Sequence, residues 1–182
     1  MKHILILAAI AVSIVITAQY LESAPSPAET GGVYPVETVT KRGEGKATEF
    51  TWKAGGKVVS FTEHTKGKVA VLNFWATWCG PCKKETPDLV ALSKEMSKDV
   101  VVVGVSVDQA DNTPTIVQNF AEKFSIPYVT IIDNSKIAES YGAIQSIPTT
   151  FIIDASGRVV QKIVGLQSKA QFEAAVKRAL GQ

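Results

Sequence analysis

The strongest constraint on the fold is an uninterrupted apolar run that leads directly into a pair of cysteines. Residues 69–72 are all apolar instead of alternating with polar residues, which is typical of a central strand in a parallel sheet. After six intervening residues comes Cys79-Gly80-Pro81-Cys82, which contains both cysteines of the chain. Apolar residues then recur at helical spacing, at Leu89, Leu92 and Met96. The pattern predicts that the cysteines lie where a strand ends and a helix begins.

That placement has a chemical consequence for Cys79. The free backbone N–H groups and the positive dipole end of a helix N-terminus stabilise an anion, so a thiol there ionises more readily. We expect Cys79 to be the exposed nucleophile and Cys82 to lie one turn deeper. The Cys79 thiolate would attack a disulfide, and Cys82 would resolve the mixed disulfide that results.

Three other uses of the cysteines fit the sequence poorly. A structural disulfide across two residues closes too short a loop to stabilise the fold by much. A zinc site needs two more nitrogen or sulfur ligands, and the only histidines are His3 and His64, so no metal is expected. Peroxidases of the peroxiredoxin type have a proline and a Thr or Ser before the nucleophile, where this chain has Leu72 and Ala76.

The run FWATWCGPCKKETPDL at residues 74–89, followed by IPTTF at residues 147–151, resembles the membrane-anchored thioredoxin-like reductases of bacteria known as the ResA and TlpA group. The resemblance covers residues 46–180. It implies an α/β thioredoxin-like sandwich with an added N-terminal β-hairpin and a central helical insertion. It also implies a redox centre made of the Cys79–Cys82 dithiol alone, with no cofactor.

The local patterns are consistent with that fold. Pro87 falls inside the helix after the cysteines, where it should kink the axis. Thr113 and Pro114 read as the N-cap and first position of another helix, and Ser168 with Gln171 as the capping box of the last helix. The remaining predictions are a hairpin over 49–53 and 57–61, strands over 100–105, 129–132, 150–153 and 158–164, and a short helix over 135–141.

The resemblance also assigns substrate-binding residues. It implies that Pro148 is cis and packs beside the cysteines, with Ile147 and Thr149 lining a groove for an extended substrate. Trp78 adjoins Cys79 and offers an aromatic contact face to a partner. Gly80-Pro81, the pair between the cysteines, resembles that of thioredoxin and favours a reducing role.

Asn73 departs from the thioredoxin pattern, in which a buried aspartate at this strand position manages the proton of the second cysteine. A side-chain amide cannot take up that proton. Glu85 lies three residues after Cys82, about one helical turn along, and ResA-type proteins have Glu at this place. We therefore expect Glu85 to be the proton carrier, against the alternative of an idle glutamate that favours the helix dipole.

Three segments are predicted along the chain. Residues 1–21 contain 18 uncharged, mostly apolar positions behind Lys2 and His3 and read as a signal peptide or membrane anchor. Residues 22–46 are rich in Pro, Gly and Ser and read as a flexible tether, and residues 47–182 as the thioredoxin-like domain. The resemblance favours an uncleaved anchor, with the domain on the outer face of the cell membrane or in the periplasm.

Composition narrows the partners. The chain has 19 basic and 17 acidic residues without a long basic run, so nucleic acid is not expected as a partner. We expect the domain to be a monomer. The resemblance implies a disulfide-containing protein substrate, with apocytochrome c first, and a CcdA- or DsbD-like membrane electron donor. The alternatives are reduction of copper-delivery proteins, general disulfide exchange, an oxidising role, and a non-catalytic thioredoxin-like binding module.

Overall fold

The computed structural model describes residues 31–182. The predicted leader at residues 1–21 and the first part of the predicted tether, residues 22–30, lie outside this range. The elements, in chain order, are β1 (Gly32–Pro35), β2 (Thr38–Thr40), β3 (Glu49–Ala54), β4 (Lys57–Ser60), α2 (Phe61–His64), β5 (Val69–Trp75), α3 (Gly80–Glu95), β6 (Val100–Ser106), α4 (Thr113–Lys123), β7 (Val129–Ile132), α5 (Lys136–Ser140), β8 (Thr149–Ile153), β9 (Val159–Val164) and α6 (Lys169–Ala179).

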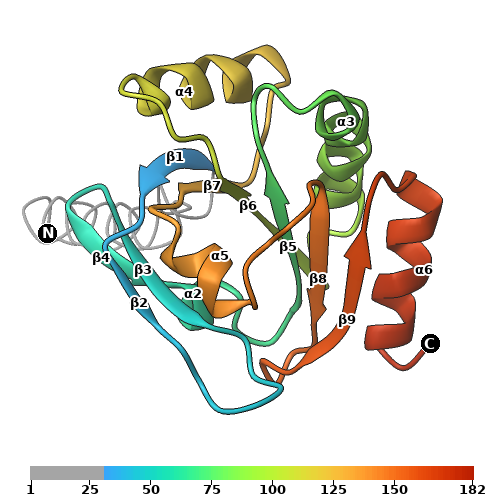
Figure 1. Ribbon diagram of the computed structural model, residues 1–182. Helices are drawn as coiled ribbons and strands as arrows, with labels where there is room; N and C mark the ends of the chain where they lie inside the picture. The colour runs from blue at the N-terminus through green and yellow to red at the C-terminus, as the bar shows by residue number, and fades with distance from the viewer. Residues whose placement is uncertain (1–30) are drawn as a thin grey trace, which may run out of the picture.

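The larger sheet has the strand order β1-β7-β6-β5-β8-β9 (Figure 1). Strands β1, β7, β6 and β5 are parallel, whereas β8 runs antiparallel to β5 and β9 antiparallel to β8. Every residue of β5 is buried, because this strand is central and both faces of the sheet are covered. That burial is the physical reason for its uninterrupted apolar sequence.

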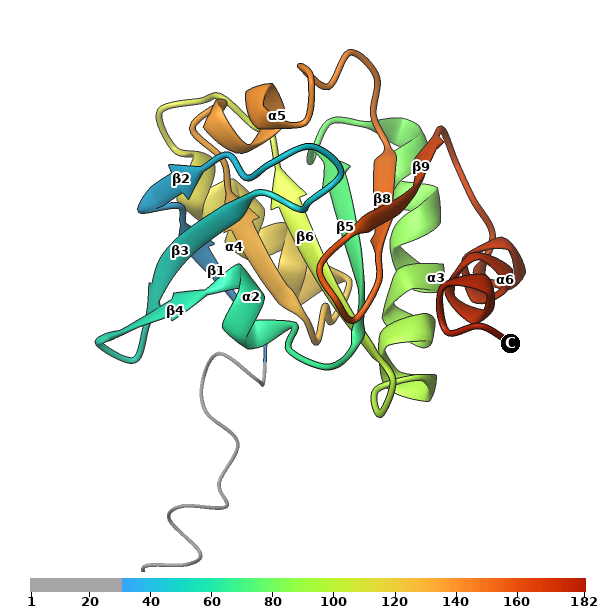
Figure 2. The ribbon, with the colours of Figure 1, turned by 90° about the horizontal axis from the view of Figure 1, so that it is seen from below.

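Helices cover one face of this sheet and a second, smaller sheet covers the other (Figures 1 and 2). On the helical face, α3 and α6 bury Leu89, Leu92 and Phe172 against the strands, and α4 adds Val117 and Phe120. On the opposite face, the antiparallel sheet β2-β3-β4 packs with α2 and α5 over a core that includes these large side chains: Phe50, Trp52, Phe61, Leu72, Phe74, Ile131, Ile137 and Phe151.

The predicted architecture is therefore correct in its main features. The chain forms an α/β sandwich with the added hairpin β3–β4, and the helix α4 is inserted between β6 and β7. The capping box of the last helix is present at Ser168 and Gln171. Pro87 lies inside α3 as predicted.

The prediction of a flexible tether is wrong for its second half. Residues 32–35 form β1, which pairs with β7 in parallel register at the edge of the larger sheet, and residues 38–40 form β2 of the smaller sheet. Tyr34 and Val39 pack against the core, and the backbone N–H of Val36 donates to the carbonyl of Ile132 at 3.0 Å. Burial of these β-forming side chains outweighs the Pro- and Gly-rich composition around them.

Two predicted boundaries also move. Phe61 begins helix α2 instead of ending the hairpin strand, because the Ser60 side chain caps the helix by accepting from the N–H of Glu63. Thr113 is the first residue of α4 and not its N-cap, which is Asn112. The Thr113 hydroxyl instead donates to the carbonyl of Ala110 at 2.6 Å, in the preceding turn.

Candidate active site

The two predicted halves of the site meet at one end of the larger sheet. Strand β5 ends at Trp75 and the chain returns as helix α3, while β8 begins beside it, with Phe74 of β5 opposite Thr149 of β8. The loop from β5 to α3 and the loop leading into β8 therefore lie at the same end of the sheet (Figure 1). This is the carboxyl end of the parallel strands, where ligand sites of α/β folds are found.

Cys79 and Cys82 are joined by a disulfide, as expected. Cys79 is the N-cap residue of α3, and its sulfur accepts a hydrogen bond of 3.2 Å from the backbone N–H of Cys82. The helix N-terminus thus places a donor directly on Cys79 Sγ, where it would stabilise a thiolate after reduction.

The expectation that Cys79 is exposed is wrong for this disulfide-bonded state. Cys79 is 4% exposed and Cys82 is 2% exposed. Both belong to an apolar cluster with Trp75 and Phe120, and the loop before β8 covers the Cys79 side. An approaching substrate must therefore reach Cys79 Sγ past the edge of this loop.

The Ile147–Pro148 peptide bond is cis, as predicted. The carbonyl oxygen of Ile147 lies 3.8 Å from Cys79 Sγ, which places the cis-proline loop against the disulfide. Ile147 is half-buried, whereas Pro148 and Thr149 are buried. The hydroxyl of Thr149 donates to the carbonyl of Ser146 at 2.7 Å, so it is already bonded within its own loop. Thr149 contributes instead to the wall of a pocket formed with residues 142–146 and β9.

The predicted contact residues around the sulfur are largely exposed. Trp78 is 69% exposed, the largest exposed fraction among the big apolar side chains of residues 31–182. Gly80 and Pro81 are exposed as well. Trp75, in contrast, is buried and packs on Phe120 with ring centroids 4.5 Å apart, so it belongs to the core.

Glu85 lies behind the cysteines, on the face of α3 that packs on the sheet. It is 1% exposed, although it carries a carboxyl group. Asn73 Nδ2 donates to Glu85 Oε1 at 2.9 Å, and the backbone N–H of Gln167 donates to Oε2 at 2.8 Å. Asn73 also donates to the hydroxyl of Thr150 at 2.9 Å. The amide that replaces the thioredoxin aspartate therefore orients Glu85.

Burial raises the pKa of Glu85 to about 7, against the opposing effect of the two hydrogen bonds from Gln167 and Asn73. A carboxyl group with this pKa is close to half-protonated at neutral pH, so it can both accept and release a proton. Burial and the neighbouring Glu85 also raise the pKa of Tyr128, which keeps that phenol protonated.

One buried carboxylate of the site was missed by the sequence reasoning. Asp108 follows β6 and is 2% exposed, and it accepts hydrogen bonds from Thr77, which lies two residues before Cys79. The only sequence signal for this residue is a carboxylate two positions after the end of the apolar strand β6.

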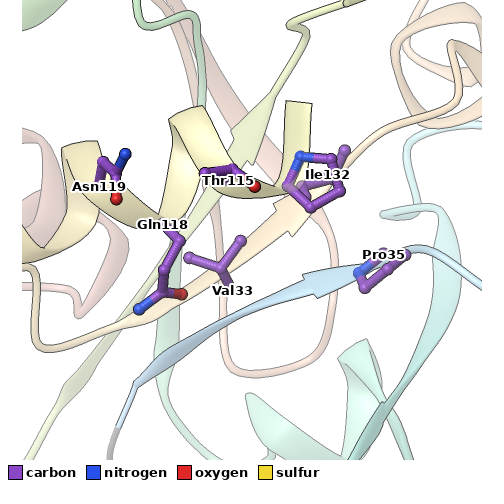
Figure 3. A pocket seen from close by; sticks show the side chains of 7 residues that line it. Val33, Pro35, Thr115, Gln118, Asn119 and Ile132 are labelled. Carbon is purple, nitrogen blue, oxygen red and sulfur yellow. The ribbon is translucent and has the colours of Figure 1, made fainter. Parts of the chain in front are cut away.

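One further pocket lies apart from these residues. The pocket in Figure 3 lies between β1, α4 and the end of β7, with Val33 and Gln118 in its walls, and none of its lining residues belongs to the predicted site. Within residues 31–182, His, Cys, Asp and Glu side chains form no group of three that could hold a metal ion. No helix in this part of the chain is long and apolar enough to cross a membrane.

Comparison with known proteins agrees with this geometry. The Redoxin family profile matches residues 42–179. The chain is 34% identical to the thioredoxin-like protein YneN of Bacillus subtilis over 128 residues, which is 70% of this chain and 75% of YneN. It is 39% identical to the thiol-disulfide oxidoreductase ResA of Bacillus thuringiensis over 115 residues. This alignment covers 62% of this chain and 64% of ResA, which is less than two thirds of the length of ResA.

Solved structures show the same fold. A thiol:disulfide interchange protein of the thioredoxin family from Chlorobium tepidum superimposes with a TM-score of 0.67 at 36% identity, covering 78% of this chain and all of that chain. StoA from Bacillus subtilis superimposes with a TM-score of 0.60 at 24% identity, covering 71% of this chain and 97% of StoA. The chain therefore belongs to the Redoxin family, and it is a thioredoxin-fold thiol:disulfide oxidoreductase related to ResA.

Proposed function

We propose that this oxidoreductase works as a reductant of protein disulfides outside the cytoplasm, and that apocytochrome c is its substrate during cytochrome c maturation. The reducing direction is supported by Gly80-Pro81 between the cysteines and by the similarity to ResA. The observation that carries disulfide exchange is the pairing of Cys79 at a helix N-cap with a buried Glu85 whose pKa is raised to about 7. This pair supplies a nucleophile at one end of the exchange and a proton carrier at the other.

The first step uses the reduced enzyme. The Cys79 thiolate attacks one sulfur of the substrate disulfide, so a bond forms between Cys79 Sγ and that sulfur while the substrate S–S bond breaks. The other substrate sulfur leaves as a thiolate and takes up a proton. The N–H of Cys82, which lies 3.2 Å from Cys79 Sγ, stabilises the attacking thiolate.

The second step releases the substrate. Cys82 loses its proton to the Glu85 carboxylate and attacks Cys79 Sγ, which forms the enzyme disulfide and expels the second substrate thiolate. Two electrons have passed from the enzyme dithiol to the substrate, which leaves as a dithiol. Glu85 then releases its proton to solvent or to the departing thiolate, which its near-neutral pKa allows.

The substrate-binding surface would consist of the exposed Trp78, Gly80 and Pro81 on one side of the sulfur and the loop of Ile147 and Pro148 on the other. Thr149 is buried, so it would support that loop through its bond to Ser146. The cis-proline loop lies against the disulfide, and backbone pairing with an extended substrate there would hold it in place. Trp78 supplies a large apolar contact because it is mostly exposed.

Location and partners rest on the resemblance to ResA-type proteins. Outside the cytoplasm disulfides persist, so a reductant needs electrons from inside, and a CcdA- or DsbD-like membrane protein would supply them. Anchoring would come from residues 1–21. Copper-delivery proteins and general disulfide exchange are the alternative substrates, and an oxidising role or a non-catalytic binding module is the alternative outside this class.

A pair of cysteine variants tests the mechanism. Cys79→Ser should abolish reduction of a model protein disulfide, whereas Cys82→Ser should accumulate a covalent complex with the substrate, which non-reducing electrophoresis reveals. Trapping by Cys79→Ser instead would reverse the roles. Turnover of the model disulfide by the wild type that is lost in Cys79→Ser supports the enzyme, whereas no turnover by the wild type would favour the binding module.

Thiol trapping in intact cells tests the direction. Alkylation before lysis should find Cys79 and Cys82 mostly reduced if the enzyme works as a reductant. A mostly oxidised pair would support the oxidising alternative. Reduced apocytochrome c in wild-type cells but not in cells that carry Cys79→Ser would support the proposed substrate.

A further inference from the structure

Asp108 is a buried carboxylate that the two exchange steps leave without a role. It lies just beyond the end of β6 and accepts three side-chain or backbone hydrogen bonds. Thr77 Oγ1 donates to its Oδ1 at 2.6 Å, the Thr77 N–H donates to Oδ2 at 2.9 Å, and Ser106 Oγ donates to Oδ2 at 2.7 Å. No Lys, Arg or His of residues 31–182 forms an ion pair with it.

Two of these three bonds hold a single residue of the loop between β5 and the first cysteine. Because Thr77 is bonded through both its backbone and its side chain, its position and its rotamer are fixed together. The adjoining backbone is fastened as well, since the N–H of Val107 donates to the carbonyl of Trp75 at 2.9 Å. The N–H of Cys79 in turn donates to the carbonyl of Ala76 at 3.1 Å. The residues at and just after the end of β6 thus bond to Trp75 and Thr77, which lie on either side of Ala76 in the segment before Cys79.

We propose that Asp108 is a positioning residue for the redox reaction, which holds Thr77 so that Cys79 stays at the N-cap of α3 with its sulfur on the N–H of Cys82. This inference rests on the oxidoreductase activity and is independent of the reducing direction. The N–H donor stabilises a thiolate only when the sulfur is within hydrogen-bond distance, so small movements of the loop change the reactivity of Cys79.

The charge of Asp108 acts in the opposite sense to its hydrogen bonds. A negative charge near a thiolate disfavours ionisation, whereas correct placement at the helix N-terminus favours it. Substitution of Asp108 removes both effects together. Thr77→Val separates them, because valine keeps the branched shape of threonine and leaves the carboxylate in place but removes the bond from Oγ1 to Oδ1.

The experiment measures the alkylation rate of Cys79 against pH in the reduced full chain, with mass spectrometry to identify the modified cysteine. Thr77→Val should raise the apparent pKa of Cys79 and slow its alkylation at pH 7 by about fivefold, the size of one hydrogen bond. Thr77→Ser keeps the hydroxyl and should return the profile toward that of the wild type.

Asp133→Asn is the control for loss of stability alone. Asp133 is also buried and accepts two backbone bonds, from Ile137 at 3.0 Å and Ala138 at 2.9 Å, but these cap α5 instead of the cysteine loop. Asp133→Asn should lower the free energy of unfolding and leave the Cys79 profile unchanged. If Thr77→Val lowers stability while its alkylation profile coincides with the wild type, Asp108 is only structural and the inference fails. That outcome leaves turnover intact, so it is distinct from a failure of the oxidoreductase assignment.

Discussion

Replacement of Glu85 by Gln should remove the fall in folding stability that the wild type shows between about pH 4.5 and pH 7. Burial raises the pKa of this carboxyl from its ordinary value of 4.5 to about 7 in the native state. Between these values the unfolded chain has released the proton while the native protein still holds it. The native state therefore binds more protons, and stability falls as the pH rises.

The magnitude follows from the size of that displacement. Each pH unit across the window between the two pKa values changes the free energy of unfolding by about 1.4 kcal/mol, so the total is about 3 kcal/mol. The contribution is fully present below pH 4.5 and is lost once the pH passes about 7. The Glu85→Gln curve should lack this fall.

Denaturant unfolding of the oxidised protein at a series of pH values from 4 to 8 provides the assay. Glu85→Gln also has a constant penalty, because the amide cannot accept from both Asn73 Nδ2 and the Gln167 N–H without placing its own NH₂ group against one of these donors. The test is therefore the difference in slope and not the offset. Asp88→Asn is the matched control. The charge of Asp88 makes the smallest contribution to the raised pKa of Glu85, so this variant should keep the fall in stability with pH.

Parallel stability curves for the wild type and Glu85→Gln would refute the reasoning, since they would show that Glu85 has the same pKa in the native and unfolded states. A fall with pH that persists in Glu85→Gln would assign the titration to another group. Neither result would bear on whether Cys79 exchanges disulfides, which is measured separately.

Three further substitutions probe the site and its supports. Trp78→Ala should leave the free energy of unfolding within about 0.5 kcal/mol of the wild type, because the side chain is 69% exposed, and should raise KM for a protein disulfide more than for a small one. Gly104→Ala should destabilise the fold by about 1–3 kcal/mol, measured by denaturant unfolding, because the new Cβ would lie 2.9 Å from Trp75 Nε1. Ser168→Ala should lower the thermal midpoint through the loss of about 1 kcal/mol at the N-cap of α6, and an unchanged midpoint would show that the capping box adds nothing.

Much of the fold could be predicted because local signals and tertiary packing agree in this chain. The continuous apolar run of β5 indicates a strand covered on both faces, and the cysteines follow where this strand leads into the N-terminus of α3. The cis Ile147–Pro148 bond was predicted from the family resemblance, because most X-Pro peptide bonds in folded proteins are trans.

The remaining features depend on contacts that no local pattern contains. Strand β1 is four residues long and forms because β7, almost a hundred residues away, offers it an open edge. The burial of Cys79 depends on Ile147, which belongs to another loop. The hydrogen bonds of Asp108 depend on Thr77, which follows the neighbouring strand β5. Each of these features is a contact between short segments far apart in the sequence. Composition and hydrophobic periodicity do not predict such contacts.

The direction of β1 has a consequence for how the enzyme is presented to its partners. Because β1 is parallel to β7, β6 and β5, the chain enters the sheet at Gly32 from the end opposite to the one where β5 delivers the cysteines. Any attachment made through the residues that precede β1 would therefore hold the domain at the end of the sheet opposite to Cys79, so that the end with the cysteines faces away from the point of attachment.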